Sequence, residues 1–146
     1  MSSPYQAILL DHFRTPRHAS VWAPDEPHFL LNNPLCGDAI SIQAELDQGC
    51  LATISYSVKG CAVLTASASI QSVLLVDREL KEASEIIEAY LAYFDHRDAW
   101  EHGLDDSMTA LCELRKTPMR IKCATLPWLA LQRERPGERA RARWRI

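Results

Sequence analysis

The sequence predicts an α+β domain, with a helix first, two or three antiparallel strands next and further helices after them. Two segments, residues 39–46 and 51–58, alternate apolar and polar side chains with a period of two, as half-buried strands do. Two later segments, residues 65–77 and 84–94, instead place apolar side chains at helical spacing. The chain has 146 residues, the size of one ordinary domain, and 47% of them are hydrophobic. It can therefore bury a substantial core without disulfide bonds.

The first half of the chain contains the predicted strands. Residues 5–13 repeat apolar side chains with a helical period, and Pro16 ends this first helix. Residues 22–34 contain three further prolines, so we expect irregular structure there. The two alternating segments are separated by residues 47–49, a turn that contains glycine, and together they predict a hairpin. Residues 61–64 could form a short third strand.

The second half of the chain is predicted to be helical. The first of its two long helices begins with small side chains that allow close approach to a neighbouring element. Ser84 is a candidate N-cap of the second. Residues 96–106 are polar and indicate a loop, and residues 108–114 fit a short helix. Pro118 begins the last helix, and we expect Pro127 to disturb it or to mark a junction.

Composition limits the compartments and the classes of site. No apolar run approaches the roughly 20 residues that span a bilayer. Residues 1–10 lack the basic start of a secretory signal. We therefore expect a cytoplasmic protein with no membrane partner. The five cysteines, an odd number, argue against a disulfide framework and favour metal binding, catalysis or plain packing.

Charge divides the chain into two parts. Residues 133–146 hold six Arg and two Glu, a net charge of +4, whereas the remaining residues carry −7. We therefore expect one domain over residues 1–132 and a basic C-terminal tail over residues 133–146. Such a tail either binds nucleic acid or is simply solvated. We do not expect nucleic-acid binding, because no aromatic-rich or repeated basic motif accompanies the arginines.

Residues 33–38, Asn-Pro-Leu-Cys-Gly-Asp, are the first segment with recognisable chemistry. Pro34 restricts its own backbone, and Gly37 permits conformations that other residues resist. Side chains two apart in an extended segment point the same way, so Cys36 and Asp38 can face one point in space. The alternative is a turn that carries a buried cysteine, and this segment alone does not separate the two.

Two more cysteines lie in surroundings that suit a site. Cys61 follows Gly60 and precedes small residues, and Cys123 has Arg120 and Lys122 beside it. Those positive charges, with the nearby start of a helix, would favour the Cys123 thiolate. Each cysteine could equally be a core residue. Three thiolates and one carboxylate make a sensible tetrahedral zinc site, but these long spacings do not by themselves predict zinc.

Four segments, taken in order, resemble the U-type iron–sulfur cluster assembly family, the IscU and NifU N-terminal type. They are residues 11–17 (DHFRTPR), 33–38 (NPLCGD), 60–69 (GCAVLTASAS) and 118–128 (PMRIKCATLPW). The resemblance runs from about Tyr5 to Trp128. It implies a small antiparallel sheet of about three strands packed by helices on one face, the SufE/IscU-like fold.

Two features resemble the SufU branch of that family. Lys122 stands where scaffold members carry a histidine, and the interval from Cys61 to Cys123 is longer than theirs. The resemblance to this branch implies zinc bound by three cysteines and one aspartate, here Cys36, Asp38, Cys61 and Cys123.

The same resemblance implies a sulfurtransferase-like role. The protein would accept persulfide sulfur from a SufS-type cysteine desulfurase and pass it to a downstream iron–sulfur scaffold or to apo-proteins. Cys36 would be the persulfide acceptor, and Arg120 would contact the desulfurase. Val58 departs from the Gly-x-Gly-Cys segment that is usual in the family. Cys112 falls at an expected apolar position, so we assign it to the core.

Two other functions would use the same residues. The four ligands could hold a 2Fe–2S cluster, which would make the chain a scaffold that builds the cluster and hands it to apo-proteins. Lys122 in place of histidine argues against this function. The chain could also be an interaction domain that has kept the ligands for stability.

Overall fold

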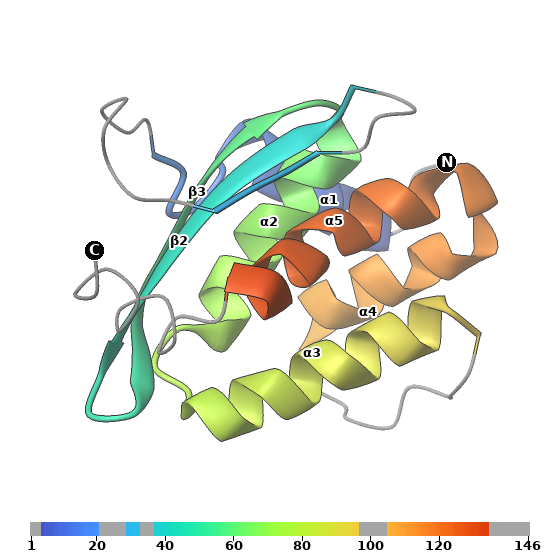
Figure 1. Cartoon of the computed structure of the whole chain (residues 1–146). Coiled ribbons are helices and arrows are strands. Elements are labelled where there is room, and N and C mark those ends of the chain that lie inside the picture. The colour runs from blue at the N-terminus through green and yellow to red at the C-terminus, as the bar shows by residue number, and fades with distance from the viewer. Residues whose placement is uncertain (1–3, 21–28, 33–36, 97–104, 135–146) are drawn as a thin grey trace.

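The computed structural model describes residues 4–20, 29–32, 37–96 and 105–134 (Figure 1). No helix among these residues is long and apolar enough to cross a bilayer. The elements are, in chain order, helix α1 (Pro4–Arg14), strands β1 (Phe29–Asn32), β2 (Ala39–Asp47) and β3 (Cys50–Lys59), helices α2 (Ala62–Leu75), α3 (Leu80–Phe94) and α4 (Asp106–Cys112), the 3-10 helix η1 (Glu113–Lys116), and α5 (Pro118–Glu134).

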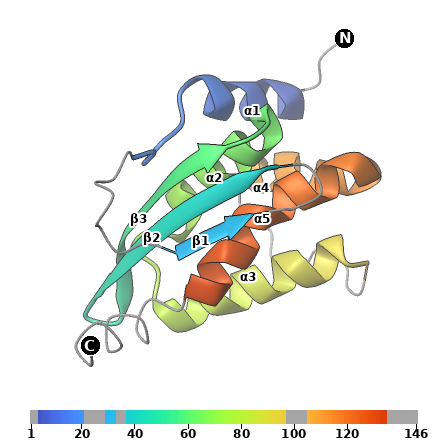
Figure 2. The ribbon, with the colours of Figure 1, turned by 45° about the horizontal axis from the view of Figure 1, so that its top comes forward.

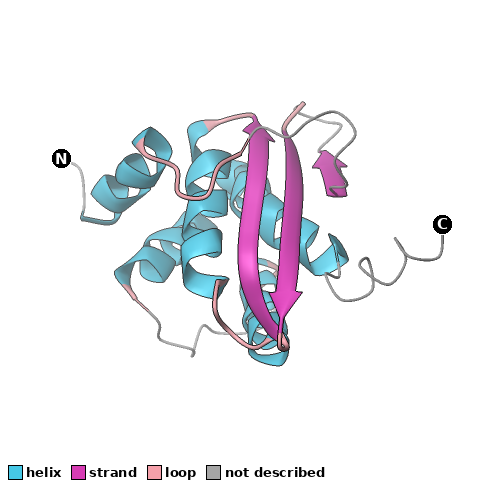
Figure 3. Ribbon diagram, turned by 90° about the vertical axis from the view of Figure 1, so that its left-hand side faces the viewer, coloured by secondary structure: helices cyan, strands magenta, loops and turns pink. Residues whose placement is uncertain are grey.

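The three strands form one antiparallel sheet in the order β1-β2-β3. β2 and β3 make the predicted hairpin, whose turn contains Gln48 and Gly49, both with positive φ. Figure 2 shows α2 and α5 against one face of this sheet, with α3 and α4 beyond them, and Figure 3 looks onto the sheet with helices behind it. The predicted α+β fold, a small sheet packed by helices on one face, is confirmed.

The third strand does not lie where we predicted it. Residues 61–64 belong to the start of α2, and β1 forms inside the segment that we expected to be irregular. The small side chains after Cys61 suit a closely packed helix, so the chain turns directly from β3 into α2. β1 has only four residues and lies at the edge of the sheet. Neighbouring prolines are tolerated at such an edge, because an edge strand needs hydrogen bonds on one side only.

The start of α3 also differs from the prediction. The helix begins at Leu80 with Glu79 as its N-cap residue, so Ser84 lies inside it. The Leu80 N–H donates to the Gly49 carbonyl at 2.9 Å, which ties the start of the helix to the hairpin turn. This contact between distant segments fixes the boundary, and the local capping signal at Ser84 has no part in it.

Pro127 does not interrupt the last helix. α5 runs from Pro118 to Glu134 with Pro127 buried inside it. Proline has no N–H to donate to the carbonyl four residues earlier, that of Cys123. The Pro127 carbonyl itself accepts a hydrogen bond from Nε2 of Gln71 at 3.0 Å. Contacts from α2 therefore support the stretch of α5 in which one intrahelical bond is missing.

The core lies between the sheet and the helices. Ile40 and Ile42 of β2 and Tyr56 of β3 are almost completely buried. Tyr90 of α3 stacks on Trp128 of α5 with ring centroids 4.0 Å apart. α2 contributes buried alanines and serines, whose small size lets this central helix approach both the sheet and α5.

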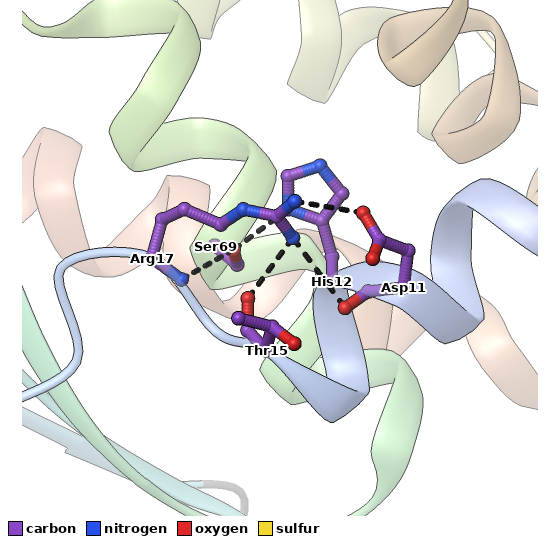
Figure 4. Close-up of polar contacts among 5 residues, drawn as sticks. All are labelled: Asp11, His12, Thr15, Arg17 and Ser69. Atoms are coloured by element: carbon purple, nitrogen blue, oxygen red, sulfur yellow. Dashed lines mark hydrogen bonds and ion pairs between the residues drawn. The ribbon is translucent and has the colours of Figure 1, made fainter.

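A polar cluster fastens α1 to α2 (Figure 4). Nδ1 of His12 lies 2.7 Å from Oγ of Ser69, and the backbone N–H of Arg17 donates to the same Oγ at 2.9 Å. The Arg17 guanidinium pairs with the Asp11 carboxylate at 2.7 Å. Burial lowers the pKa of His12, and the Arg17 charge lowers it further. The neutral imidazole is therefore the form that this cluster favours.

Candidate metal centre

Three of the four predicted ligands come together at one end of the β2–β3 hairpin. Asp38, Cys61 and Cys123 each offer one ligand atom, and these atoms all lie within 4.8 Å of one another. Sγ of Cys123 donates to Oδ2 of Asp38 at 3.2 Å. The fourth predicted ligand, Cys36, lies outside the described residues.

The register of the sheet places Asp38 beside the start of α2. Ala39 pairs with Lys59, so the residues just beyond them, Asp38 and Gly60, are neighbours at the end of the hairpin. Cys61 follows as the N-cap residue of α2. The hairpin therefore brings a carboxylate and a thiol together although 22 residues lie between them in the sequence.

Gly60 leaves the space that Asp38 occupies. A Cβ at position 60 would lie 2.6 Å from Oδ1 of Asp38 and 2.8 Å from Cδ2 of Leu64. Real Cβ atoms do not approach other atoms this closely. The sequence showed a glycine next to Cys61 but no sign that a carboxylate would lie against it. This role of Gly60 was therefore missed, and only the pairing of β2 with β3 reveals it.

Cys123 reaches the same point from α5. Its side chain is buried, whereas Arg120 and Lys122 are exposed. Burial raises the pKa of the Cys123 thiol, and hydrogen bonding to Cys61 and Asp38 raises it further. We expected the two positive charges to favour the thiolate, and in this arrangement of the protein groups that expectation is wrong. The cationic side chains are solvated, so their influence is smaller than that of burial and of the neighbouring carboxylate.

The donors fit a zinc ion. Two sulfur atoms and one carboxylate oxygen converge where Asp38 and Cys123 are buried and Cys61 is half-buried, and these are ligand types of tetrahedral zinc. The Cys123 thiol donates a hydrogen bond to the Asp38 carboxylate through its S–H proton. A divalent cation among these atoms would displace that proton, because sulfur binds zinc as the thiolate.

The remaining cysteines described by the structure lie elsewhere. Cys112 is buried in the core, as we predicted, and burial together with Glu113 raises its pKa to about 12. Cys50 begins β3, at the opposite end of that strand from Gly60. Arg120, the predicted partner contact, is exposed in the first turn of α5 beside Met119, which is 87% exposed.

Comparison with protein families identifies the chain. Residues 4–96 match the NifU-like N terminal domain family. The chain belongs to this family. Asp38 and Cys61 lie inside the matched stretch, whereas Cys123 lies beyond it and joins them through the fold.

Curated relatives extend the match past the family segment. The chain is 31% identical over 132 residues to the zinc-dependent sulfurtransferase SufU of Bacillus subtilis, covering 88% of this chain and 87% of that protein. It is 30% identical over 128 residues to the iron–sulfur cluster assembly scaffold protein IscU of Streptococcus pyogenes, covering 88% and 80%. These relatives confirm the resemblance to U-type assembly proteins and to the SufU branch.

Solved structures share the fold. The crystal structure of FiSufU from Fervidobacterium islandicum AW-1 superposes with a TM-score of 0.76 at 20% identity, over 91% of this chain and 95% of that one. The N-terminal part of a NifU-like protein from Brucella abortus superposes with a TM-score of 0.76 at 17% identity, over 89% and 90%. At these identities the likeness concerns the fold alone.

Proposed function

We propose that this protein is a zinc-dependent sulfur-transfer protein that accepts persulfide sulfur from a cysteine desulfurase for iron–sulfur cluster assembly. Membership of an assembly family supports the general role. The observation that carries the finer statement is the convergence of Asp38, Cys61 and Cys123 in a relative of a zinc-dependent sulfurtransferase. The activity we propose is sulfurtransferase-like and depends on the desulfurase as a partner.

In this proposal, Asp38, Cys61 and Cys123 hold the zinc ion together with Cys36. Bound zinc keeps coordinating thiols deprotonated near neutral pH. The first three ligands come from the segments at β2, α2 and α5, the elements that enclose the site. Cys36 lies two residues before Asp38 in the Asn-Pro-x-Cys-Gly-Asp segment, which is the basis for including it.

Cys36 is the proposed sulfur acceptor. Its thiolate attacks the outer sulfur of the persulfide on the desulfurase cysteine. A new sulfur–sulfur bond forms on Cys36, the bond in the desulfurase persulfide breaks, and the desulfurase cysteine leaves as a thiolate. The sulfur, now a persulfide on Cys36, passes to a downstream scaffold or apo-protein. No external oxidant or reductant is needed, because one persulfide replaces another.

Arg120 is proposed to contact the desulfurase. It is exposed three residues before Cys123, so a partner that reaches the site would meet its guanidinium. Met119 beside it is 87% exposed. A charged and an apolar side chain together offer a small docking surface next to the metal site.

The second candidate function is that of a 2Fe–2S scaffold. It is favoured by one observation, the 30% identity to the IscU scaffold protein of Streptococcus pyogenes. Cysteine and carboxylate ligands can hold either a zinc ion or a cluster. The two functions therefore differ in the bound inorganic group, which can be measured directly.

The deciding experiment joins metal analysis to a sulfur-transfer assay. Protein purified without oxygen should contain about one zinc per chain and show no visible absorption. Incubation with a cysteine desulfurase and cysteine radiolabelled at its sulfur should place label on the wild type and on Cys50→Ser, but not on Cys36→Ser. Full labelling of Cys36→Ser would contradict the acceptor role. Iron with acid-labile sulfide would replace the proposal with the scaffold function.

A further inference from the structure

A buried polar network holds α5 immediately after Cys123. The Ser67 hydroxyl of α2 donates to the Ala124 carbonyl at 2.6 Å. The Tyr90 hydroxyl of α3 donates to the same carbonyl at 2.8 Å. Nε1–H of Trp128 donates back to Oγ of Ser67 at 3.1 Å, so Ser67 is bonded to α5 at two points one helical turn apart.

Solvent water does not reach this network, so it cannot replace a lost hydrogen bond. Ser67, Tyr90 and Trp128 are each fully buried. A buried polar group left without its partner costs about 1–3 kcal/mol. The bonds can form only when α2 and α5 have one particular axial register. A shift of α5 by one residue would move it about 1.5 Å and rotate it by about 100°, and Ser67 would then lose both partners.

The same register sets the distance between two ligands of the proposed metal site. Cys61 is the N-cap residue of α2, six residues before Ser67, and Cys123 is the residue just before Ala124 on α5. The two thiols therefore stand on the two helices that Ser67 joins. A fully satisfied network of buried hydrogen bonds favours this one register, because any other register would leave its donors and acceptors unpaired.

We propose that Ser67 is a positioning residue for the metal site, which sets the register of α5 on α2 and thereby the placement of Cys123 relative to Cys61. The inference rests on the proposed zinc site and adds to it a residue that is not itself a proposed ligand.

Ser67→Ala tests the proposal, with Ser72→Ala as a matched control. Ser72 is also fully buried on α2, but the partners of its hydroxyl are the Ser69 and Arg17 carbonyls and Nδ1 of His18, none of which belongs to α5. Zinc affinity is measured on the full chain by competition with a chromogenic chelator. We expect Ser67→Ala to bind zinc at least about ten-fold more weakly, in the range seen when outer partners of metal ligands are lost. Ser72→Ala should bind zinc like the wild type.

The melting temperature of the metal-free protein separates positioning from stability. Both serine variants should melt earlier than the wild type, because each loses a buried hydrogen bond. An equal loss of zinc affinity in the two variants would overturn the proposal, since that loss would follow from general destabilisation. Unchanged affinity in Ser67→Ala would also overturn it while leaving the zinc site intact.

A second variant and a spectroscopic measurement complete the test. Trp128→Phe removes the Nε1–H donor but keeps an aromatic ring against Tyr90, and it should weaken zinc binding by a smaller factor than Ser67→Ala. Cobalt in place of zinc should give a changed visible spectrum in both variants, because the ligand geometry changes. A wild-type spectrum in both would overturn the proposal.

A wild type that binds neither metal would overturn the zinc site as well, whereas failed labelling at Cys36 with normal zinc affinity would overturn the sulfur-transfer function alone.

Discussion

Gly60 is required for the space it leaves, since its backbone is not in the positive-φ region that favours glycine. Its missing side chain makes room for Oδ1 of Asp38, which a Cβ would approach to 2.6 Å. Two of the three nearest atoms belong to Asp38, a proposed ligand, and the third belongs to Leu64, so relief of this clash would displace the ligand. Gly49 in the hairpin turn shows the opposite case, because its φ is +80° and a Cβ added there would meet nothing within 4 Å.

At the residue scale, we predict that Gly60→Ala weakens zinc binding by about ten-fold or more, because Asp38 must move away from the two thiols. Chelator competition measures the change. Gly49→Ala is the control: it should cost about 1 kcal/mol of unfolding free energy through backbone strain and leave zinc affinity unchanged. Normal zinc affinity in Gly60→Ala would show that Asp38 is not held where the structure places it.

At the scale of elements, α1 depends on a titratable contact with α2. His12 is buried and hydrogen-bonded to Ser69, and its pKa is lowered by burial and by Arg17, against smaller opposing effects of Asp11 and Asp105. The folded protein therefore binds a proton at His12 less readily than the unfolded chain does. The stability that this contact contributes is fully present above the ordinary histidine pKa of 6.5. It is lost as pH falls through the lower pKa that His12 has in the folded protein.

We therefore predict that the metal-free protein loses unfolding free energy as pH falls below about 6.5, and that His12→Asn reduces this dependence. Denaturant unfolding at a series of pH values, with a chelator and a reductant present, measures it. If His12→Asn and wild type have the same pH profile, His12 does not titrate as its burial implies.

At the scale of the whole molecule, the proposed metal site joins three segments that are far apart in the chain. Asp38 precedes β2, Cys61 precedes α2 and Cys123 lies on α5. An ion bound by all three would oppose separation of the sheet from both helices. Metal binding should therefore be coupled to global stability as well as to sulfur transfer.

We predict that zinc removal lowers the melting temperature. At free zinc a thousand times above Kd, the ion contributes about 4 kcal/mol, which corresponds to a shift of about 10 °C for a domain of this size. Differential scanning calorimetry with and without chelator measures it. Cys50→Ser should keep the shift and Cys61→Ser should lose it. An undiminished shift in Cys61→Ser would place the stabilising ion elsewhere.

Much of the fold follows from local patterns in the sequence. The alternation in residues 39–46 and 51–58 produced the hairpin, and the helical spacing after position 65 produced α2, because these signals repeat along the segment that forms the element. β1 was missed because four residues between prolines carry no such repeat. The start of α3 and the continuity of α5 through Pro127 were missed because two remote contacts decide them: the Leu80 N–H donates to the Gly49 carbonyl, and Nε2 of Gln71 donates to the Pro127 carbonyl.

The sequence by itself determined which chemistry the chain can carry and to which family it belongs. Cysteine, aspartate and glycine in the segments around positions 36, 61 and 123 pointed to the proposed ligands, since donor type is a property of the residue. Only the tertiary structure decided how three of them meet, why Gly60 must be small, and that burial raises the Cys123 pKa despite the nearby cations. The physical reason is that distance, burial and helix register depend on contacts between segments remote in the chain, which no local pattern encodes.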